Sequence, residues 1–342
     1  MKKIFTYSII ALFVMSVASC EKVLMQPNPE TDNISIYNEY WKLVDEKYAM
    51  WNNPDKNIDK SAIRSYTLGL VSEEMSKDSL FSVLEYIVTQ FKDGHTYLLG
   101  DKQTPRFAMY DVEAIGEKNI DQDVVDNIYL QGEFQTIGES NSLKYKLIRN
   151  NEIGYIELRS WLDEYTNEEL DEVLNYLSNT KGIVFDVREN GGGSPFMANF
   201  IARRFADKEY YVGEEHFKTG PAIDDFSSSK LYNRPSDNVQ YNKPVVVLTN
   251  NLCFSATTTF IYYLNPLPNV TFIGSRTGGG SGSTADGFLA NGWHWQMSTS
   301  EFIDWQGRHL DNGFDPDIYQ AIDYSDISKD EVIERAIEEI LN

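Results

Sequence analysis

Cysteine and histidine are scarce in this 342-residue sequence, which holds two cysteines and four histidines. Cys20 lies close to the N-terminus and Cys253 stands alone in the second half of the chain. No structural disulfide is therefore expected within the fold, and Cys253 is interpreted as a small buried side chain. No two histidines have the spacing of metal ligands. The sequence thus predicts neither a catalytic metal nor a cofactor.

Positively charged residues are also few: the sequence has 30 lysines and arginines but 52 acidic residues, which gives a formal net charge of -22. Broad electrostatic binding of nucleic acid or of an anionic membrane face is not expected for such a chain. Internal repeats and low-complexity blocks are lacking as well. The hydrophobic content of 42% at this length suffices for one large core or two modest domains.

The N-terminal hydrophobic run, in MKKIFTYSIIALFVMSVASC, is short for a membrane span. Two lysines precede it and small residues follow it before Cys20, which is the layout of a signal peptide over residues 1–20. Its last four residues resemble a bacterial lipoprotein signal, which implies cleavage before Cys20 and acylation of that cysteine. The mature protein is then expected in the cell envelope of a bacterium, lipid-anchored at the outer membrane, on its periplasmic or surface face. An ordinary secretory signal with a chance cysteine is the alternative.

The rest of the chain divides into three segments that differ in the pattern of their polar and apolar residues. Residues 21–33 form a polar tether, and residues 34–95 place apolar side chains at helical spacing, which predicts a small helical subdomain. An α/β core is predicted over 96–342, and its first part, 96–150, carries short alternating runs typical of antiparallel strands. Further on, apolar runs alternate with helical stretches, with a long loop between GIVFDV and PVVVLT. The most apolar strands are expected to be covered on both faces.

Ser255 lies where the apolar run PVVVLT gives way, after two asparagines, to the helical stretch SATTTFIYYL. This register puts the serine at or near a helix N-terminus, where unpaired N–H groups can stabilise an oxyanion. A sharp turn between a strand and a helix can also expose the serine hydroxyl to a substrate, as the nucleophile elbow does. The alternative is a plain helix N-cap, which is a common role of serine and which this stretch alone favours.

A second turn, in FDVRENGGGS, places Gly191, Gly192 and Gly193 after a strand of buried type. Adjacent glycines allow the backbone to approach another group closely or to point its amides at that group. Phosphate groups bind to such turns, but neither a phosphate-binding lysine motif nor a dinucleotide fingerprint accompanies this one. Nucleotide binding is therefore not expected.

Six segments together carry a resemblance to a known family. They are FKDGHTYL, IGYIELRSW, GIVFDVRENGGG, VVVLTNNLCFSA, FIGSRTGGGSG and LDNGFDPD. Their order and approximate spacing are similar to those of the C-terminal processing, or tail-specific, serine peptidases, whose relatives include the tricorn protease core and the modules of interphotoreceptor retinoid-binding protein. Each segment is a weak signal alone, whereas the set is specific. The resemblance implies a β/α sandwich on a ClpP/crotonase-like core.

The resemblance also implies roles for residues of this chain. Ser255 matches the family's nucleophile, and the backbone N–H groups of Ala256 and Gly192 match its oxyanion donors. Some members pair the serine with a lysine from a glycine-rich loop. Gly280 stands in the place of that lysine here, so a Ser–Lys mechanism is not expected.

Other members use the histidine of a DGHT-like turn as the base, and in this chain that residue is His95. An imidazole suits the task because it titrates close to neutral pH. The acid behind it falls by direct register on Leu310, and Asp311, one residue further, is the candidate orienting acid. Three other carboxylates near these motifs are expected to be structural: Asp93, Asp186 and Asp317.

A PDZ domain, which captures a peptide C-terminus, often follows the family's histidine. Fewer than about 60 residues separate His95 from the first apolar core strand here, too few for such a domain. The leading hypothesis is a lipid-anchored serine peptidase that acts on peptides or proteins. The first alternative, motivated by the missing lysine and the displaced acid, is an inactive member whose cleft binds a peptide or an apolar ligand. The second is a surface lipoprotein that handles glycans or nutrients through an aromatic binding face including Trp293, Trp295 and Trp305.

Overall fold

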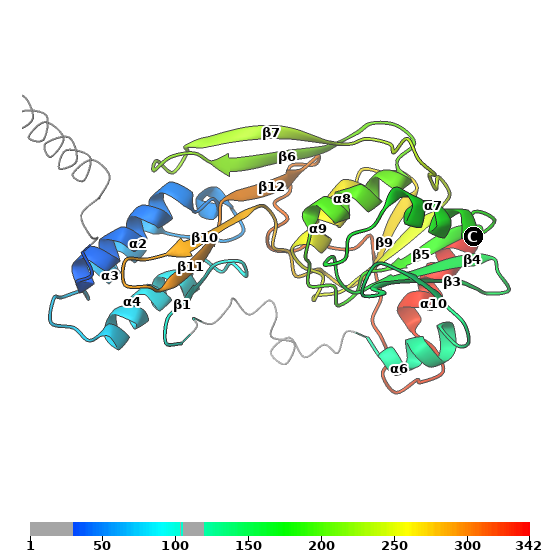
Figure 1. The fold of residues 1–342 in the computed structure, drawn as a ribbon, viewed down its shortest axis with the longest axis horizontal. Helices are drawn as coiled ribbons and strands as arrows, with labels where there is room; N and C mark the ends of the chain where they lie inside the picture. Colours follow the sequence, from blue (N-terminus) through cyan, green and yellow to red (C-terminus); the bar gives the residue numbers. More distant parts are fainter. Residues whose placement is uncertain (1–29, 103, 105–119) are drawn as a thin grey trace, which may run out of the picture.

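The structure is a computed structural model that describes residues 30–102, 104 and 120–342. Cys20 lies outside these residues, so its lipidation stays a prediction. In the described part of the chain, no helix is both long and apolar enough to cross a membrane. Figure 1 shows a helical part and an α/β part, with a long two-stranded β-ribbon running above both.

The α/β part is built on a seven-stranded sheet in the order β13-β9-β8-β5-β4-β3-β2. The four central strands, β4, β5, β8 and β9, run parallel, whereas β2 and β3 pair antiparallel at one edge. All residues of β4, β5 and β8 are buried, which agrees with strands covered on both faces. The bounds are β2 Gln135–Ile137, β3 Leu143–Ile148, β4 Ile153–Leu158, β5 Gly182–Asp186, β8 Val245–Thr249, β9 Val270–Gly274 and β13 Ile318–Tyr319.

Alternate residues of these strands enter two different cores, as the period of two of a β-strand requires. Phe185 and Val247 pack with helices α7 (Asn167–Tyr176), α8 (Pro195–Ala202) and α9 (Ala256–Leu264) on one face. Their neighbours Val184 and Val246 pack on the other face with α10 (Glu331–Leu341) and the helical turn η3 (Val125–Tyr129). The sheet is therefore the middle layer of three (Figure 1).

The helical part contains α2 (Asn33–Lys47), the turn η1 (Met50–Asn52), α3 (Lys60–Leu68) and α4 (Lys77–Gln90). The side chains of Asp32, Asp59 and Ser76 cap the three helices. These helices share their core with a three-stranded sheet in the order β1-β11-β10. Its strands are β1 Tyr97–Leu99, β10 Thr284–Phe288 and β11 His294–Ser298. The late hairpin β10–β11 thus completes a core that begins with the first helices.

The hairpin also decides the place of two tryptophans. Trp293 and Trp295 are 9% and 5% exposed and belong to the core of the helical part. They do not form the aromatic binding face that was one alternative for this sequence.

The structure corrects two expectations about irregular or extended segments. The long loop expected between GIVFDV and PVVVLT contains α8 and the β-ribbon of β6 (Tyr210–Lys218) and β7 (Phe226–Asn233), which pairs with β12 (Ser300–Asp304). Four successive residues of β7 are exposed, so the ribbon lacks the alternation that reveals a half-buried strand. Part of the 96–150 segment is also helical, in α6 (Gln122–Val124) and η3, because Val125 and Tyr129 pack towards α10.

Candidate active site

Ser255 occupies the turn between the carboxyl end of β8 and the start of α9. Its φ is 58° and its ψ is -116°, a strained conformation for a residue with a side chain. Ser255 stands at the N-cap position of α9, but its side chain makes no capping hydrogen bond. Its hydroxyl instead lies 3.0 Å from His95 Nε2. The strained backbone thus directs the hydroxyl to an imidazole rather than to the helix.

His95 comes from the helical part, where it lies two residues before the start of β1. Asp93 holds its turn: Asp93 Oδ1 accepts a hydrogen bond from the His95 N–H at 2.9 Å, and Asp93 Oδ2 accepts one from Thr96 Oγ1 at 2.7 Å. Gln296 of β11 donates to the His95 carbonyl oxygen at 2.8 Å. The structure therefore brings the two predicted residues, Ser255 and His95, together across the boundary between the helical part and the α/β part.

The glycine turn after β5 presses against the serine. A Cβ at Gly192 would lie 2.7 Å from Ser255 Cβ and 3.2 Å from the Ala256 nitrogen, so only glycine fits. The Gly192 N–H donates to Asn190 Oδ1 at 3.0 Å, so this predicted oxyanion donor already has a partner. The Ala256 N–H, at the start of α9, has no hydrogen-bond partner among the described residues. One of the two predicted donors is thus available without rearrangement.

Asp311 does not orient His95 in this structure. Its carboxylate is 1% exposed and forms an ion pair with Lys56, whose Nζ lies 2.6 Å from Asp311 Oδ2. His95 Nδ1 is buried and has no hydrogen-bond partner among the described residues. Burial raises the pKa of Asp311, although the charge of Lys56 opposes the shift. The expected hydrogen bond between Asp311 and His95 is absent because a buried lysine takes the carboxylate.

The structure also shows which of the two neighbouring residues, Leu310 or Asp311, places a carboxylate near the site. Residues 310 and 311 lie outside any strand, so strict alternation of faces does not apply to them. Both are 1% exposed, but Leu310 belongs to the apolar core of the α/β part. Asp311 is therefore the carboxylate at this place in the fold.

Phe254 excludes a lysine from the position of Gly280. Gly280 has a φ of 69°, and a Cβ there would lie 2.2 Å from the Phe254 ring. The same ring packs against His95, with 4.7 Å between the ring centroids. The space that a Ser–Lys arrangement would need is filled by an aromatic side chain that supports the histidine.

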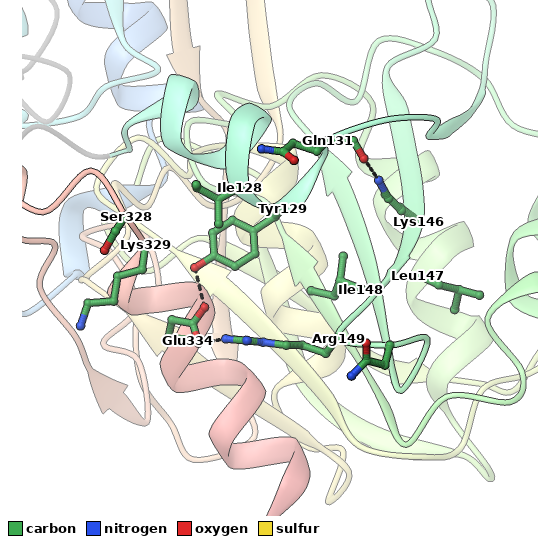
Figure 2. Close-up of a pocket in the computed structure, with 11 residues that line it drawn as sticks. Ile128, Tyr129, Gln131, Lys146, Leu147, Ile148, Arg149, Ser328, Lys329 and Glu334 are labelled. Carbon is green, nitrogen blue, oxygen red and sulfur yellow. Dashed lines mark hydrogen bonds and ion pairs between the residues drawn. The ribbon is translucent and has the colours of Figure 1, made fainter.

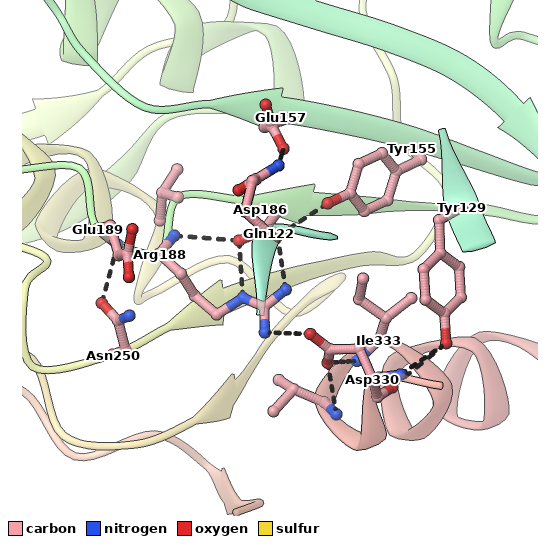
Figure 3. A network of polar contacts seen from close by, with 12 residues as sticks. Gln122, Tyr129, Tyr155, Glu157, Asp186, Arg188, Glu189, Asn250, Asp330 and Ile333 are labelled. Carbon is pink, nitrogen blue, oxygen red and sulfur yellow. Dashed lines mark hydrogen bonds and ion pairs between the residues drawn. The ribbon is translucent and has the colours of Figure 1, made fainter. Parts of the chain in front are cut away.

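A buried ionic network fixes the base of the glycine turn. Figure 3 shows the guanidinium of Arg188 between two carboxylates, Asp186 at the end of β5 and Asp330 at the N-terminus of α10. Two nitrogens of Arg188 donate to Asp186 at 2.9 and 2.7 Å, and a third donates to Asp330 at 2.8 Å. Burial favours a raised pKa for Asp186, but the charges of Arg159 and Arg188 outweigh it and the pKa is lowered. Asp186 is thus structural, as expected.

The other two carboxylates expected to be structural also have such contacts. Asp93 holds the histidine turn, and Asp317 Oδ2 accepts a hydrogen bond from the Phe272 N–H of β9 at 2.8 Å. Cys253 is buried beside the serine turn, where burial raises the pKa of its thiol to about 12. The cysteine is therefore a packing residue with its thiol protonated at neutral pH.

A cavity of about 640 Å³ lies away from the serine (Figure 2). The turn between β3 and β4 lines it, at the opposite end of the parallel strands from Ser255. Its cations already have partners: Arg149 pairs with Glu334, Lys146 donates to the Gln131 carbonyl oxygen, and Lys329 lies 3.9 Å from Glu331. This cavity therefore offers no charged group to the chemistry at Ser255.

Lys56 is the residue that the sequence analysis missed. It lies in the polar segment WNNPDKNIDK, where no periodicity separates a buried lysine from an exposed one. Arg188, next to the glycine turn, was also missed. Its position between an apolar strand and NGGG was the available signal, because a charge there needs a buried partner.

Comparisons with known proteins give similarities of sequence and of fold. Residues 152–320 match the sequence profile of peptidase family S41. A carboxy-terminal processing protease of Bacillus subtilis, CtpA, is 30% identical over 137 residues, which are 40% of this chain and 28% of that protein. The chain therefore matches well under half of the length of that curated relative.

Solved structures extend the likeness to nearly the whole chain. A crystal structure of a candidate peptidase from Parabacteroides merdae has a TM-score of 0.82 and 32% identity, covering 92% of this chain and 98% of the other. Mature CPAF has a TM-score of 0.64 at 11% identity, over 90% of this chain and 96% of its own. The photosystem II D1 C-terminal processing protease has a TM-score of 0.53 at 14% identity, over 85% and 94%. The last two likenesses concern the fold alone.

Proposed function

Because this chain belongs to peptidase family S41, we propose that it is a serine-type peptidase that hydrolyses peptide bonds through an acyl-enzyme on Ser255. One observation carries the proposal: the Ser255 hydroxyl lies 3.0 Å from His95 Nε2, on a turn strained to a φ of 58°. A nucleophile within hydrogen-bond reach of a base is the arrangement that activates a serine. A strained turn at a helix N-terminus presents that serine as on a nucleophile elbow.

The mechanism follows from these positions. His95 Nε2 accepts the proton of Ser255 Oγ as the oxygen attacks the substrate carbonyl, and the imidazolium then protonates the leaving amine. The Ala256 N–H stabilises the developing oxyanion at the start of α9. Gly192 supplies a second donor if its N–H is shared between Asn190 Oδ1 and the oxyanion. Water then attacks the acyl-enzyme, with His95 again as the base.

A replacement of His95 by glutamine tests the proposal. We expect His95→Gln to lower the hydrolysis rate of a broad peptide library by about 10²–10⁴-fold, because general base catalysis at the serine is lost. The matched control is His216→Gln, since His216 contacts Glu214 on the β-ribbon at 3.0 Å and not the serine. Hydrolysis should be measured by mass spectrometry of the products. Equal rates for wild type and His95→Gln would contradict the proposed base.

A second candidate function is retained because of Asp311. The carboxylate is paired with Lys56, and His95 Nδ1 has no partner among the described residues, so an inactive family member that binds a peptide or an apolar ligand would fit the same site. A wild type that binds library peptides without cleaving them favours this candidate. We further propose that a lipid on Cys20 anchors the mature chain in the cell envelope, which the mass of its N-terminal peptide tests.

A further inference from the structure

Lys56 is a buried lysine that connects the helical part to the α/β part. Its side chain is 0% exposed, and its Nζ makes two contacts of 2.6 Å. One contact is with Asp311 Oδ2 of the α/β part, and the other is with the carbonyl oxygen of Lys92, three residues before His95. A buried ammonium is costly unless it is paired, and these two contacts supply the pairing.

On the α/β side, Asp311 is joined to the turn of the nucleophile. Its Oδ1 accepts a hydrogen bond from the Ser281 N–H at 3.1 Å, and its carbonyl oxygen accepts one from the Gly280 N–H at 2.8 Å. The preceding residue, Gly279, accepts a hydrogen bond from the Ser255 N–H at 3.0 Å. A shift of Asp311 is therefore transmitted to Ser255 through two backbone contacts.

On the helical side, Lys92 begins the turn that carries the base. Lys92 has a φ of 49°, and Asp93 then holds both the His95 N–H and Thr96 Oγ1. These hydrogen bonds tie the His95 backbone to Asp93, which directly follows Lys92. Lys56 thus acts on both partners of the catalytic pair, from a position that touches neither side chain.

We propose that Lys56 is a positioning residue for the reaction: by joining the Lys92 carbonyl to Asp311, it docks the His95 turn on the Ser255 turn. The inference rests on the proposed peptidase function. It gives the buried ion pair a role that burial alone does not explain, since buried ion pairs contribute little net stability. A misplacement of about 1 Å at a reacting pair costs on the order of 10²-fold in rate, so the contact acts on catalysis rather than on substrate binding.

Lys56→Met tests the inference, because methionine keeps the length of the side chain without its charge and donors. We expect kcat to fall by about 10–100-fold while KM stays within about two-fold. Without the ammonium, the pKa of Asp311 rises further, so the acid limb of the kcat profile moves to higher pH. The charged or titratable groups that act on Asp311 are Lys56, Asp93, His95, His309 and Tyr48.

Lys60→Met is the matched control. Lys60 lies four residues away, and its Nζ pairs with Asp45 at 2.8 Å on the surface of the helical part. Its kcat and pH profile should equal those of the wild type. Lys56→Gln is the second variant if Lys56→Met does not fold, because its amide can still donate to one of the two buried oxygens.

The outcomes separate this inference from the proposed function. An inactive wild type refutes the peptidase and with it the role of Lys56. An active wild type with a kcat and an acid limb unchanged in the folded Lys56 variant refutes only the positioning role. A fall in kcat at constant KM, together with the shifted acid limb, supports the inference, since loss of stability alone would leave the pH profile of the folded fraction in place.

Discussion

Ser255→Gly and Ser255→Ala are both expected to lower peptide hydrolysis by about 10⁴-fold or more, because each removes the nucleophilic oxygen. The two variants should nevertheless differ in stability. Alanine must keep the φ of 58° that serine has here, whereas glycine adopts this conformation without strain. The pair therefore separates the chemical role of the hydroxyl from the structural cost of the turn.

The magnitude follows from two opposing effects. Relief of backbone strain contributes about 1–3 kcal/mol, and the greater freedom of glycine in the unfolded chain costs about 0.5–1 kcal/mol. We expect Ser255→Gly to be more stable than Ser255→Ala by about 1 kcal/mol, measured by denaturant unfolding. Both lack the hydrogen bond to His95, so this bond cancels in the comparison. Equal stabilities would show that the turn stores no strain.

Arg188→Met is expected to produce the largest loss of stability, about 3–5 kcal/mol, because it leaves two buried carboxylates without their shared cation. Arg188 is 1% exposed and contacts Asp186 and Asp330 with three nitrogens. Asp330 also caps α10, by accepting hydrogen bonds from the Val332 and Ile333 N–H groups at 2.9 and 3.0 Å. The variant should therefore loosen both α10 and the base of the glycine turn.

The control for Arg188 is Arg335→Met within α10. Arg335 forms an i,i+4 pair with Glu339 on a part-exposed face at 2.9 Å, so its loss should cost no more than about 0.5 kcal/mol. The pKa of Asp186 is lowered by its arginines, so its stabilising contribution is fully present above the ordinary carboxyl pKa and is lost only as the pH falls below it. In Arg188→Met one of the two lowering charges is gone and burial favours a raised pKa for Asp186, so the stability difference from the wild type should be largest at pH 8 and smaller at pH 5. A difference that grows from pH 8 to pH 5 would contradict the network.

The sequence predicts those elements whose burial follows a simple period. The fully buried strands β4, β5 and β8 and the amphipathic helices α2, α4, α7 and α10 lie where apolar periodicity places them. The β-ribbon of β6 and β7 was missed because its exposed, polar residues carry no such period. The packing of the β10–β11 hairpin into the core of the helical part was also missed. No local pattern encodes a contact between segments about 200 residues apart.

The candidate site divides in the same way. Ser255, His95 and the Gly192 turn could be predicted, because their neighbouring residues form motifs of a known family and the structure brings them together. The partner of Asp311 could not be predicted, because a lysine in a polar segment usually lies in water and only tertiary packing buries Lys56. The occupied Gly192 N–H likewise depends on the rotamer of Asn190, which sequence does not specify.

The most direct test of the account is covalent labelling with a fluorophosphonate probe, followed by peptide mapping of the modified residue. The proposed peptidase predicts a single adduct on Ser255 in the wild type, none on Ser255→Gly, and labelling slowed by about 10²-fold or more in His95→Gln. Cys253, which is buried with a protonated thiol, should remain unmodified in all three. A wild type that stays unlabelled, or one that is labelled equally in the Ser255→Gly variant, would contradict the assignment of Ser255 as the nucleophile.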